Sequence, residues 1–271
     1  MKIGVIGGGV VGHATARVFM EHADVMVYDT DPVKATHGLT DTIKADIIFV
    51  CLPTPQSQSG YECDTKIIED FFGSVTEKNL PFVIRSTVPV GFTRKMAGKY
   101  GHVEMCHSPE FLTARCAVAD AHIPSRNIVG IADPYRPAPA LWSRLVKLYQ
   151  TRFPGVQTIT MLSDESELVK LGTNSFFASK LAWWNELHQY CVAIGVDFQT
   201  VREGILADGR IAHSHTQVPG PDGKCGFGGA CLPKDINNLV ACMMKAGVPS
   251  YVNNGASLRN TYDRSRPAQS N

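Results

Sequence analysis

Cys231 stands in a sequence context that could make its thiol a nucleophile. Residues 226–235 read GFGGACLPKD, and proline is favoured at the first position of a helix. Cys231 is therefore expected just before a helix N-terminus, where the helix dipole and nearby Lys234 favour the thiolate. A thiolate beside a hydride acceptor could capture an aldehyde, and the tetrahedral adduct could then lose a second hydride. An inert, buried cysteine is the alternative, and this context alone does not decide between them.

A metal site is a further alternative for the same thiol. His213, His215, Cys225 and Cys231 are of the types that bind zinc. Their spacing matches no common zinc motif, so we expect no metal.

Lys170 and Asn174 are four residues apart, which places them on one face of a helix, with Glu167 one turn earlier. An ammonium beside an amide could stabilise an alkoxide that develops at a carbonyl carbon. The competing interpretation is a solvated helical face, the usual setting of a lone Lys and Asn.

The start of the chain carries a candidate dinucleotide-binding turn. An apolar run leads into GGGVVG, which matches the pattern GxGxxG. Gly7 permits a tight turn, Gly9 lets the backbone approach a pyrophosphate, and Gly12 lets the following helix pack on the strand. A secretion signal is the less favoured interpretation of this segment, because the glycines have this better explanation.

Asp29 falls at the end of the next expected strand, where a carboxylate would bind ribose hydroxyls and repel a 2′-phosphate. The sequence therefore predicts NAD rather than NADP as the cofactor. The expected cofactor contacts here are Gly7, Gly9, Val10, Val11, Gly12 and Asp29.

Two further turns follow expected strands, STVPVG at 86–91 and SPEFL at 108–112. In open α/β sheets ligands bind at the carboxyl ends of the strands, so both turns are placed where a ligand would lie. As isolated motifs they carry little weight.

Short apolar runs rich in β-branched residues alternate with helical stretches through residues 1–160. Several runs are apolar at consecutive positions, which is typical of parallel strands covered on both faces. This predicts an α/β fold, an N-terminal Rossmann-type doubly wound parallel sheet. The expected strands are 2–6, 25–28, 47–51, 82–85, 103–106, 127–131 and 157–160.

Residues 161–271 are expected to form an all-α domain. Apolar residues recur at helical spacing from Ser163 until Gly195, which predicts one helix of about thirty residues. A second helix is expected from Asp197 to Ala207, and a third opening at Pro233 after a loop rich in Gly and Pro. The tail from Asp263 is polar and is expected to be frayed.

Composition excludes several classes of protein. With 44% hydrophobic and 19% charged residues the chain is expected to be globular rather than disordered. The net charge is +1, so no general field attracts nucleic acid or an anionic membrane. No segment is long and apolar enough to predict a membrane span. The eight cysteines show no paired framework, which favours reduced thiols in the cytoplasm.

In combination these segments resemble the UDP-glucose and GDP-mannose dehydrogenase family of nucleotide-sugar 6-dehydrogenases. The motifs follow in order: GGGVVG, CLPTP at 51–55, STVPVG, SPEFL, the helix with Lys170 and Asn174, VPGPDGK and GFGGACLPKD. The resemblance covers nearly the whole chain, and its last motif is highly specific.

The resemblance implies a four-electron oxidation of a sugar C6 alcohol with two NAD, UDP-glucose to UDP-glucuronate in the leading hypothesis. It implies that Cys231 forms a thiohemiacetal and then a thioester, that Lys170 and Asn174 hold the oxyanion, and that Asp235 and Thr87 move a proton through water. It also implies a homodimer through the long helix. The other residues that it implies are Glu110 in thioester hydrolysis, Thr87 at the cofactor, Glu110, Phe111, Leu112, Lys170, Asn174, Phe227, Gly228 and Gly229 around the sugar, and Arg210 reaching a neighbouring subunit's substrate.

Three departures from the family pattern stand out. Ala114 replaces a second acid, the connection between Asp29 and Asp46 is short, and the chain is expected to lack the C-terminal nucleotide-binding domain.

Two other functions stay open as alternatives. One is a non-catalytic, truncated relative that binds NAD, and the other is a β-hydroxyacid dehydrogenase, which carries out a single oxidation.

Overall fold

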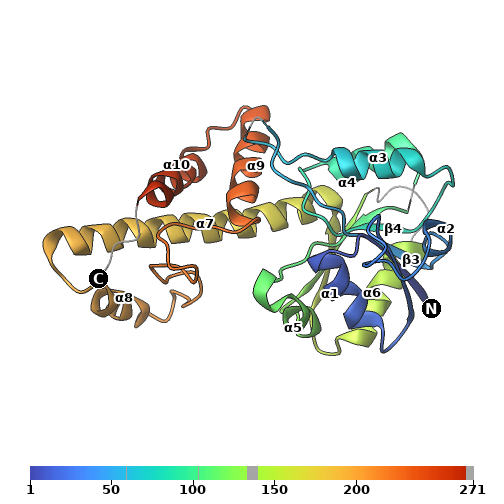
Figure 1. The fold of residues 1–271 in the computed structure, drawn as a ribbon, viewed down its shortest axis with the longest axis horizontal. Helices are drawn as coiled ribbons and strands as arrows, with labels where there is room; N and C mark the ends of the chain where they lie inside the picture. Colours follow the sequence, from blue (N-terminus) through green and yellow to red (C-terminus); the bar gives the residue numbers. More distant parts are fainter. Residues whose placement is uncertain (59, 103, 133–139, 267–271) are drawn as a thin grey trace. The chain divides into compact units, whose positions relative to one another are not determined.

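A computed structural model describes residues 1–58, 60–102, 104–132 and 140–266. The chain divides into two compact units (Figure 1). The first unit comprises 1–55 and 64–170, and the second comprises 171–271 together with the short arm 56–63. Each unit is considered by itself below.

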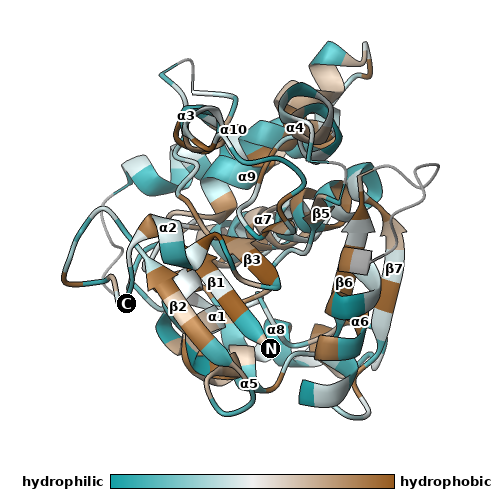
Figure 2. Ribbon diagram, turned by 90° about the vertical axis from the view of Figure 1, so that its right-hand side faces the viewer, coloured by the Kyte–Doolittle hydropathy of each residue, from teal (hydrophilic) through white to brown (hydrophobic). Residues whose placement is uncertain are grey.

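The first unit contains a seven-stranded sheet in the order β2-β1-β3-β4-β5-β6-β7. All neighbouring strands are parallel except β5 and β6, so the predicted Rossmann-type sheet is confirmed as a mostly parallel one. Brown, hydrophobic residues follow the strands in Figure 2. The strands are β1 (Lys2–Ile6), β2 (Asp24–Tyr28), β3 (Ile47–Val50), β4 (Phe82–Ile84), β5 (Cys106–His107), β6 (Asn127–Ile131) and β7 (Thr158–Leu162).

The antiparallel pairing of β5 with β6 corrects the expectation of parallel strands throughout. Cys106 pairs with Ile131, and His107 pairs with Gly130. The connection between these strands contains α5 (Ala117–His122), a helix of six residues that rises only about 9 Å. The apolar pattern of a strand is the same in both directions, so the sequence pattern could not predict this pairing.

Helices cover both faces of the sheet because successive strand residues point to opposite sides. Ile47 and Phe49 pack with α1 (Val10–Phe19), α5 and α6 (Ala140–Arg152) in one apolar cluster. Ile48 and Val50 pack with α2 (Leu39–Thr42), α3 (Lys66–Ser74) and α4 (Phe92–Tyr100) in another. A short 3₁₀ helix, η1 (Ala114–Cys116), precedes α5.

One long helix, α7 (Ser163–Ile194), follows β7 directly and has 32 residues, as the apolar periodicity predicts. It ends at Gly195, whose φ of +74° is the left-handed conformation that terminates helices. The second unit holds the part of α7 from Leu171 onward, together with α8 (Phe198–Leu206), α9 (Leu232–Lys245) and α10 (Tyr251–Ser265). Asp197 caps α8, because its carboxylate accepts a hydrogen bond from the backbone N–H of Thr200 at 2.7 Å.

The expectation of a frayed tail from Asp263 is wrong for residues 263–265, and its last part, 267–271, lies outside the described residues. α10 continues to Ser265, and Asp263 is 2% exposed and pairs with Arg259 at 2.7 Å. This ion pair is local on the helix, between residues four apart, and it holds the last turn in place.

Candidate functional site

The glycine turn after β1 has the geometry that a dinucleotide requires. Gly7 has a φ of +98°, a backbone conformation that would be strained in any residue with a side chain. A Cβ on Gly12 would lie 1.7 Å from the carbonyl oxygen of Gly7, so α1 can approach the strand only through glycine. Space around Gly9 is open, with nothing within 4 Å of its Cβ position. The turn is therefore tight on the protein side and accessible where a pyrophosphate would approach α1.

Asp29 lies at the carboxyl end of β2, beside this turn. Its Oδ2 accepts a hydrogen bond from the Gly8 amide at 2.6 Å, and its Oδ1 accepts one from the Asp31 amide at 2.8 Å. These two bonds fix the plane of the carboxylate, while each oxygen keeps a further lone pair for a ribose hydroxyl. The residues of the first unit thus fit NAD.

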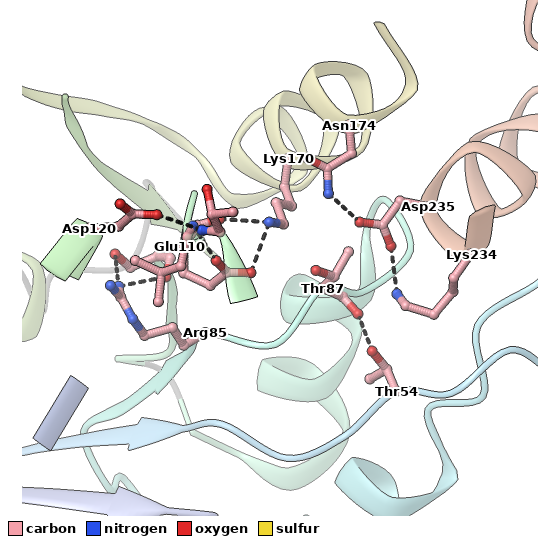
Figure 3. A network of polar contacts seen from close by, with 12 residues as sticks. Thr54, Arg85, Thr87, Glu110, Asp120, Lys170, Asn174, Lys234 and Asp235 are labelled. Atoms are coloured by element: carbon pink, nitrogen blue, oxygen red, sulfur yellow. Dashed lines mark hydrogen bonds and ion pairs between the residues drawn. The ribbon is translucent and has the colours of Figure 1, made fainter. Parts of the chain in front are cut away.

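Lys170 and Glu110 form a buried ion pair in the first unit (Figure 3). The Lys170 Nζ lies 2.8 Å from Glu110 Oε1 and 2.7 Å from the Glu110 backbone oxygen. Lys170 is 4% exposed and Glu110 is 8% exposed, so the helical-face interpretation of Lys170 is wrong. The pair joins α7 to the SPEFL turn after β5.

The charge on Glu110 is maintained by its surroundings. Burial, the largest influence, acts to raise the pKa of Glu110, but the Lys170 ammonium, the Leu112 amide and Arg85 together lower it below its ordinary value. The Leu112 amide donates to Glu110 Oε2 at 2.7 Å. Glu110 is therefore a fixed carboxylate, which could orient water or accept a proton.

Arg85, at the end of β4, supports the same turn and was not singled out from the sequence. Its Nε donates to Thr15 Oγ1 at 3.1 Å, and its Nη1 donates to Tyr149 Oη at 3.1 Å and to the Ser108 backbone oxygen at 3.2 Å. Ser108 and Tyr149 hydroxyls are themselves 2.7 Å apart. The only local signal was the position of Arg85 directly before the STVPVG turn.

The STVPVG turn is joined to the CLPTP segment that follows β3. Ser86 Oγ donates to the Leu52 backbone oxygen at 2.6 Å. Thr54 Oγ1 donates to the Thr87 backbone oxygen at 2.7 Å (Figure 3). Thr87 is half-buried. Two motifs that are separate in sequence therefore form one layer at this edge of the sheet.

In the second unit, Cys231 is the N-cap residue of α9, and Pro233 lies in the first turn. Cys231 is exposed, so the alternative of a buried cysteine is wrong. Its backbone oxygen accepts a hydrogen bond from the Asp235 amide at 2.8 Å. Cys231 thus lies at the N-terminus of α9, the positive end of the helix dipole, as the sequence predicts.

Asp235 is the centre of a polar cluster beside this N-terminus. It is 1% exposed, and its Oδ2 accepts a hydrogen bond from Asn174 Nδ2 at 2.6 Å (Figure 3). The Lys234 ammonium lies 2.6 Å from its other oxygen. A buried carboxylate with an amide and an ammonium as donors is held in one orientation.

Two asparagines hold the glycine-rich loop before Cys231. Asn185 Oδ1 accepts a hydrogen bond from the Gly226 amide at 2.7 Å, and Asn260 Oδ1 accepts one from the Phe227 amide at 2.6 Å. Gly226 has a φ of +75°, and a Cβ there would lie 2.5 Å from Asn260 Oδ1. Phe227 is 2% exposed and its side chain packs in an apolar cluster of the unit.

The other residues predicted to contact the substrate differ in exposure and in their neighbours. Gly229 has a φ of +78° and open space at its Cβ position, whereas a Cβ on Gly228 would meet the end of Arg264. The side chain of Arg210 is 89% exposed and lies 2.5 Å from Asp208. Phe111 stacks under the guanidinium of Arg126, with 3.9 Å between the charge centre and the ring centroid.

Neither a membrane span nor a metal cluster was found in the described part of the chain. No described helix is both long enough and apolar enough to cross a bilayer. No three His, Cys, Asp or Glu side chains among the described residues are grouped as metal ligands.

The fold and the glycine turn define a dinucleotide-binding protein of the Rossmann type. Residues 34–152 match the NAD binding domain of the UDP-glucose/GDP-mannose dehydrogenase family, and residues 164–262 match the central domain of the same family. The chain belongs to the UDP-glucose/GDP-mannose dehydrogenase family.

Individual relatives agree with this assignment. A UDP-glucose 6-dehydrogenase from Campylobacter jejuni is 28% identical over 89% of this chain and 67% of its own. A UDP-glucose dehydrogenase structure from Pyrobaculum islandicum superposes with a TM-score of 0.82 at 24% identity, over 96% of this chain and 68% of that one. The chain spans 49% to 67% of the length of the first five curated relatives.

The fold is shared with a second kind of dehydrogenase. A 3-hydroxyisobutyrate dehydrogenase from Mycobacterium tuberculosis superposes with a TM-score of 0.75 at 17% identity, over 98% of this chain and 94% of that one. At this identity the likeness concerns the fold alone, so chemistry must be inferred from the residues.

Proposed function

We propose that the chain carries out the NAD-dependent oxidation of the C6 alcohol of a nucleotide sugar to a carboxylate, with UDP-glucose as the expected substrate. The observation that carries this proposal is the place of Cys231, exposed at the N-terminus of α9 in a chain whose first unit is an NAD-binding domain. A β-hydroxyacid dehydrogenase has no need for a thiol at such a position. The relatives named UDP-glucose 6-dehydrogenase support the choice of substrate.

The first oxidation converts the alcohol to an aldehyde, with loss of one hydride and one proton. NAD supplies the hydride acceptor. The residues that would hold it are Gly7, Gly9, Val10, Val11, Gly12, Asp29 and Thr87. Asp235 and Thr87 would take the hydroxyl proton through water.

The second oxidation would proceed on Cys231. Its thiolate adds to the aldehyde carbon and gives a thiohemiacetal, whose alkoxide is stabilised by Lys170 and Asn174. Loss of a second hydride, for which a second NAD would be the acceptor, would give a thioester. Water, activated by Glu110, then cleaves the C–S bond, which releases the carboxylate and regenerates the thiol.

Sugar specificity is assigned to the backbone around two motifs. Glu110, Phe111 and Leu112 in one turn, and Gly228 and Gly229 before Cys231, would contact the sugar. Phe227 would support them from the apolar cluster of its unit. Arg210, exposed in this chain, would reach the substrate of a neighbouring subunit.

We also propose that two copies associate through α7. Phe176, Trp183 and Tyr190 are seven residues apart, and they are 66%, 52% and 61% exposed. Residues at this spacing share one face of a helix, so they form an exposed aromatic stripe. A stripe of this kind is typical of a surface that another copy covers.

The test is a panel of sugar nucleotides incubated with NAD, with NADH counted per sugar consumed. Two NADH per sugar, with a uronate as product, would support the proposal. One NADH would indicate a single oxidation. Binding of NAD by calorimetry without turnover of any sugar nucleotide would instead indicate a non-catalytic NAD-binding protein.

A further inference from the structure

Glu167 lies on α7 one turn before Lys170 and is 0% exposed. Its Oε2 accepts a hydrogen bond from the Gly91 amide at 2.5 Å. Its Oε1 accepts hydrogen bonds from the Thr93 amide at 2.8 Å and from Thr93 Oγ1 at 2.5 Å. Gly91 and Thr93 lie at the N-terminus of α4, whose first amides have no partners within the helix. A carboxylate at this end also interacts favourably with the helix dipole.

These bonds fix the end of the STVPVG turn, residues 86–91. Gly91 closes the turn with a φ of +88°. The beginning of the turn is held separately, by Ser86 on Leu52 and by Thr54 on Thr87. Thr87 therefore lies in a segment that is fixed at both ends, and Glu167 provides one of the two attachments.

The burial of Glu167 indicates a specific role. A buried carboxylate is costly unless its oxygens are hydrogen-bonded, and here they accept three hydrogen bonds. Burial raises the pKa of Glu167 to about 7, while the hydrogen bonds from Thr93 and Gly91 act to lower it. If the acid served only to keep the helix soluble, it would lie in solvent rather than in the interior.

A second contact joins the same two helices and differs in kind. Asp164, also on α7, pairs with Arg94 of α4 at 2.7 Å. The side chains are 32% and 65% exposed, and neither makes a hydrogen bond to the described backbone of the turn in this pair. Asp164 therefore offers a matched control, because it lies near Gly91 and connects α7 to α4 but makes no hydrogen bond to the turn.

We propose that Glu167 is a positioning residue that sets the STVPVG turn, and with it Thr87, for the cofactor. The inference rests on the proposed function, in which Thr87 contacts NAD. One face of α7 then fixes two strand-end turns: Glu167 holds residues 86–91, and Lys170, three residues later, holds 108–112 through Glu110. Neither residue need touch the reacting atoms to hold these turns.

The experiment compares NAD affinity by calorimetry in the wild-type chain, Glu167→Ala, Glu167→Gln and Asp164→Asn. Removal of a buried hydrogen-bonded carboxylate should weaken NAD binding about tenfold in Glu167→Ala. Glu167→Gln keeps one acceptor oxygen and should lie between Glu167→Ala and the wild type. Asp164→Asn should bind NAD as the wild type does. Hydrogen exchange of peptides spanning 86–93 should quicken in Glu167→Ala and stay slow in Asp164→Asn.

If Glu167→Ala does not fold, Thr93→Val gives the same test with one of the three hydrogen bonds removed, and a smaller loss of affinity is expected. The inference would be overturned if folded Glu167→Ala bound NAD, and exchanged hydrogen at 86–93, as the wild type does. Where Thr93→Val replaces Glu167→Ala in the test, the same result in Thr93→Val would overturn it. An equal loss in Asp164→Asn would do the same, because general contact between the helices would then be the cause. A wild-type chain that binds NAD without turnover would defeat the proposed function and leave this comparison decisive.

Discussion

The Lys170 ammonium lies 2.8 Å from the Glu110 carboxylate in a pair that is almost entirely buried. The two residues are 60 positions apart in the sequence, so the pair joins α7 to the turn after β5. The ammonium also contacts the Glu110 backbone oxygen at 2.7 Å. The pair therefore fixes the turn as well as the two charges.

Removal of one partner of this pair should destabilise the protein strongly. Lys170→Met leaves the Glu110 carboxylate buried without its counter-charge, which costs about 3 to 5 kcal/mol. The double variant Lys170→Met, Glu110→Gln should recover much of this loss, because no buried charge remains. Denaturant unfolding of the four proteins in the cycle measures the coupling. Equal free energies of unfolding for the wild type and Lys170→Met would contradict the argument.

Cys231 should be alkylated before the other thiols. It is exposed at a helix N-terminus, whereas burial raises the pKa of Cys51 and Cys106 to about 12 and of Cys63 to about 11. Iodoacetamide at mildly acidic pH, followed by peptide mass spectrometry, should therefore label Cys231 first.

Cys116 is the control for this labelling, because it is also exposed but caps α5, a helix of only six residues, whereas α9 has 14. Faster labelling of Cys116 than of Cys231 would show that exposure rather than the α9 N-terminus controls reactivity. In turnover, Cys231→Ala should form no carboxylate, and Cys116→Ala should be unaffected. Two NADH per sugar from Cys231→Ala would make the thioester route untenable.

Local patterns predicted most of the secondary structure. Consecutive apolar residues identified the buried strands, because a strand covered on both faces cannot alternate with polar residues. The helical periodicity of apolar residues, which ends at Gly195, predicted the length of α7. Pro233 placed the start of α9, and with it Cys231 as the cap. Each of these signals lies within a few residues of the element that it predicts.

Long-range features could not be predicted in the same way. The direction of β6 is set by pairing, and the apolar pattern of a strand is the same in both directions. The α10 helix was missed because Tyr251, Val252 and Leu258 are 84%, 74% and 64% exposed, so they form no buried stripe. The bond from Phe227 to Asn260 spans 33 positions and has no local signature.

The carboxylate of Asp29 should make the chain prefer NAD. Its repulsion of a 2′-phosphate should weaken NADP binding at least about tenfold, or about 1.4 kcal/mol. Asp29→Ala should narrow this ratio, while Asp24→Asn, at the other end of β2, should leave it unchanged. Calorimetry with both cofactors measures the ratio. Equal affinities of the wild-type chain for NAD and NADP would contradict this role of Asp29.

His107 should make stability fall in acid. It is 0% exposed, its Nδ1 lies 2.6 Å from Ser166 Oγ, and burial lowers its pKa to about 3 from 6.5. Between these values the unfolded chain binds a proton that the folded chain does not. Stability is therefore fully present above pH 6.5, and it is lost by up to about 1.4 kcal/mol per pH unit as the pH falls towards 3.

His107→Asn isolates this contribution, because the amide can keep the hydrogen bond to Ser166 without titrating. The comparison is needed because Glu167 affects stability in the opposite direction. Its pKa is raised to about 7, so its contribution to the stability of the fold is lost as the pH rises from 4.5 to 7. The difference in unfolding free energy between His107→Asn and the wild type should move in favour of the variant below pH 6.5. A difference that stays constant from pH 7 to 4 would contradict the assignment.

The aromatic stripe on α7 should control association. If Phe176, Trp183 and Tyr190 are covered by a second copy, a charge at the middle position should disrupt the dimer, since it would be buried there without a partner. We expect Trp183→Glu to sediment as a monomer and the wild type to have twice that mass. Ile123→Glu replaces an apolar residue that is 83% exposed in the first unit, and it should remain dimeric. Because Arg210 is proposed to reach the neighbouring substrate, Trp183→Glu should also lose turnover while it keeps its affinity for NAD. A Trp183→Glu dimer with unchanged turnover would show that the stripe is not the contact between copies.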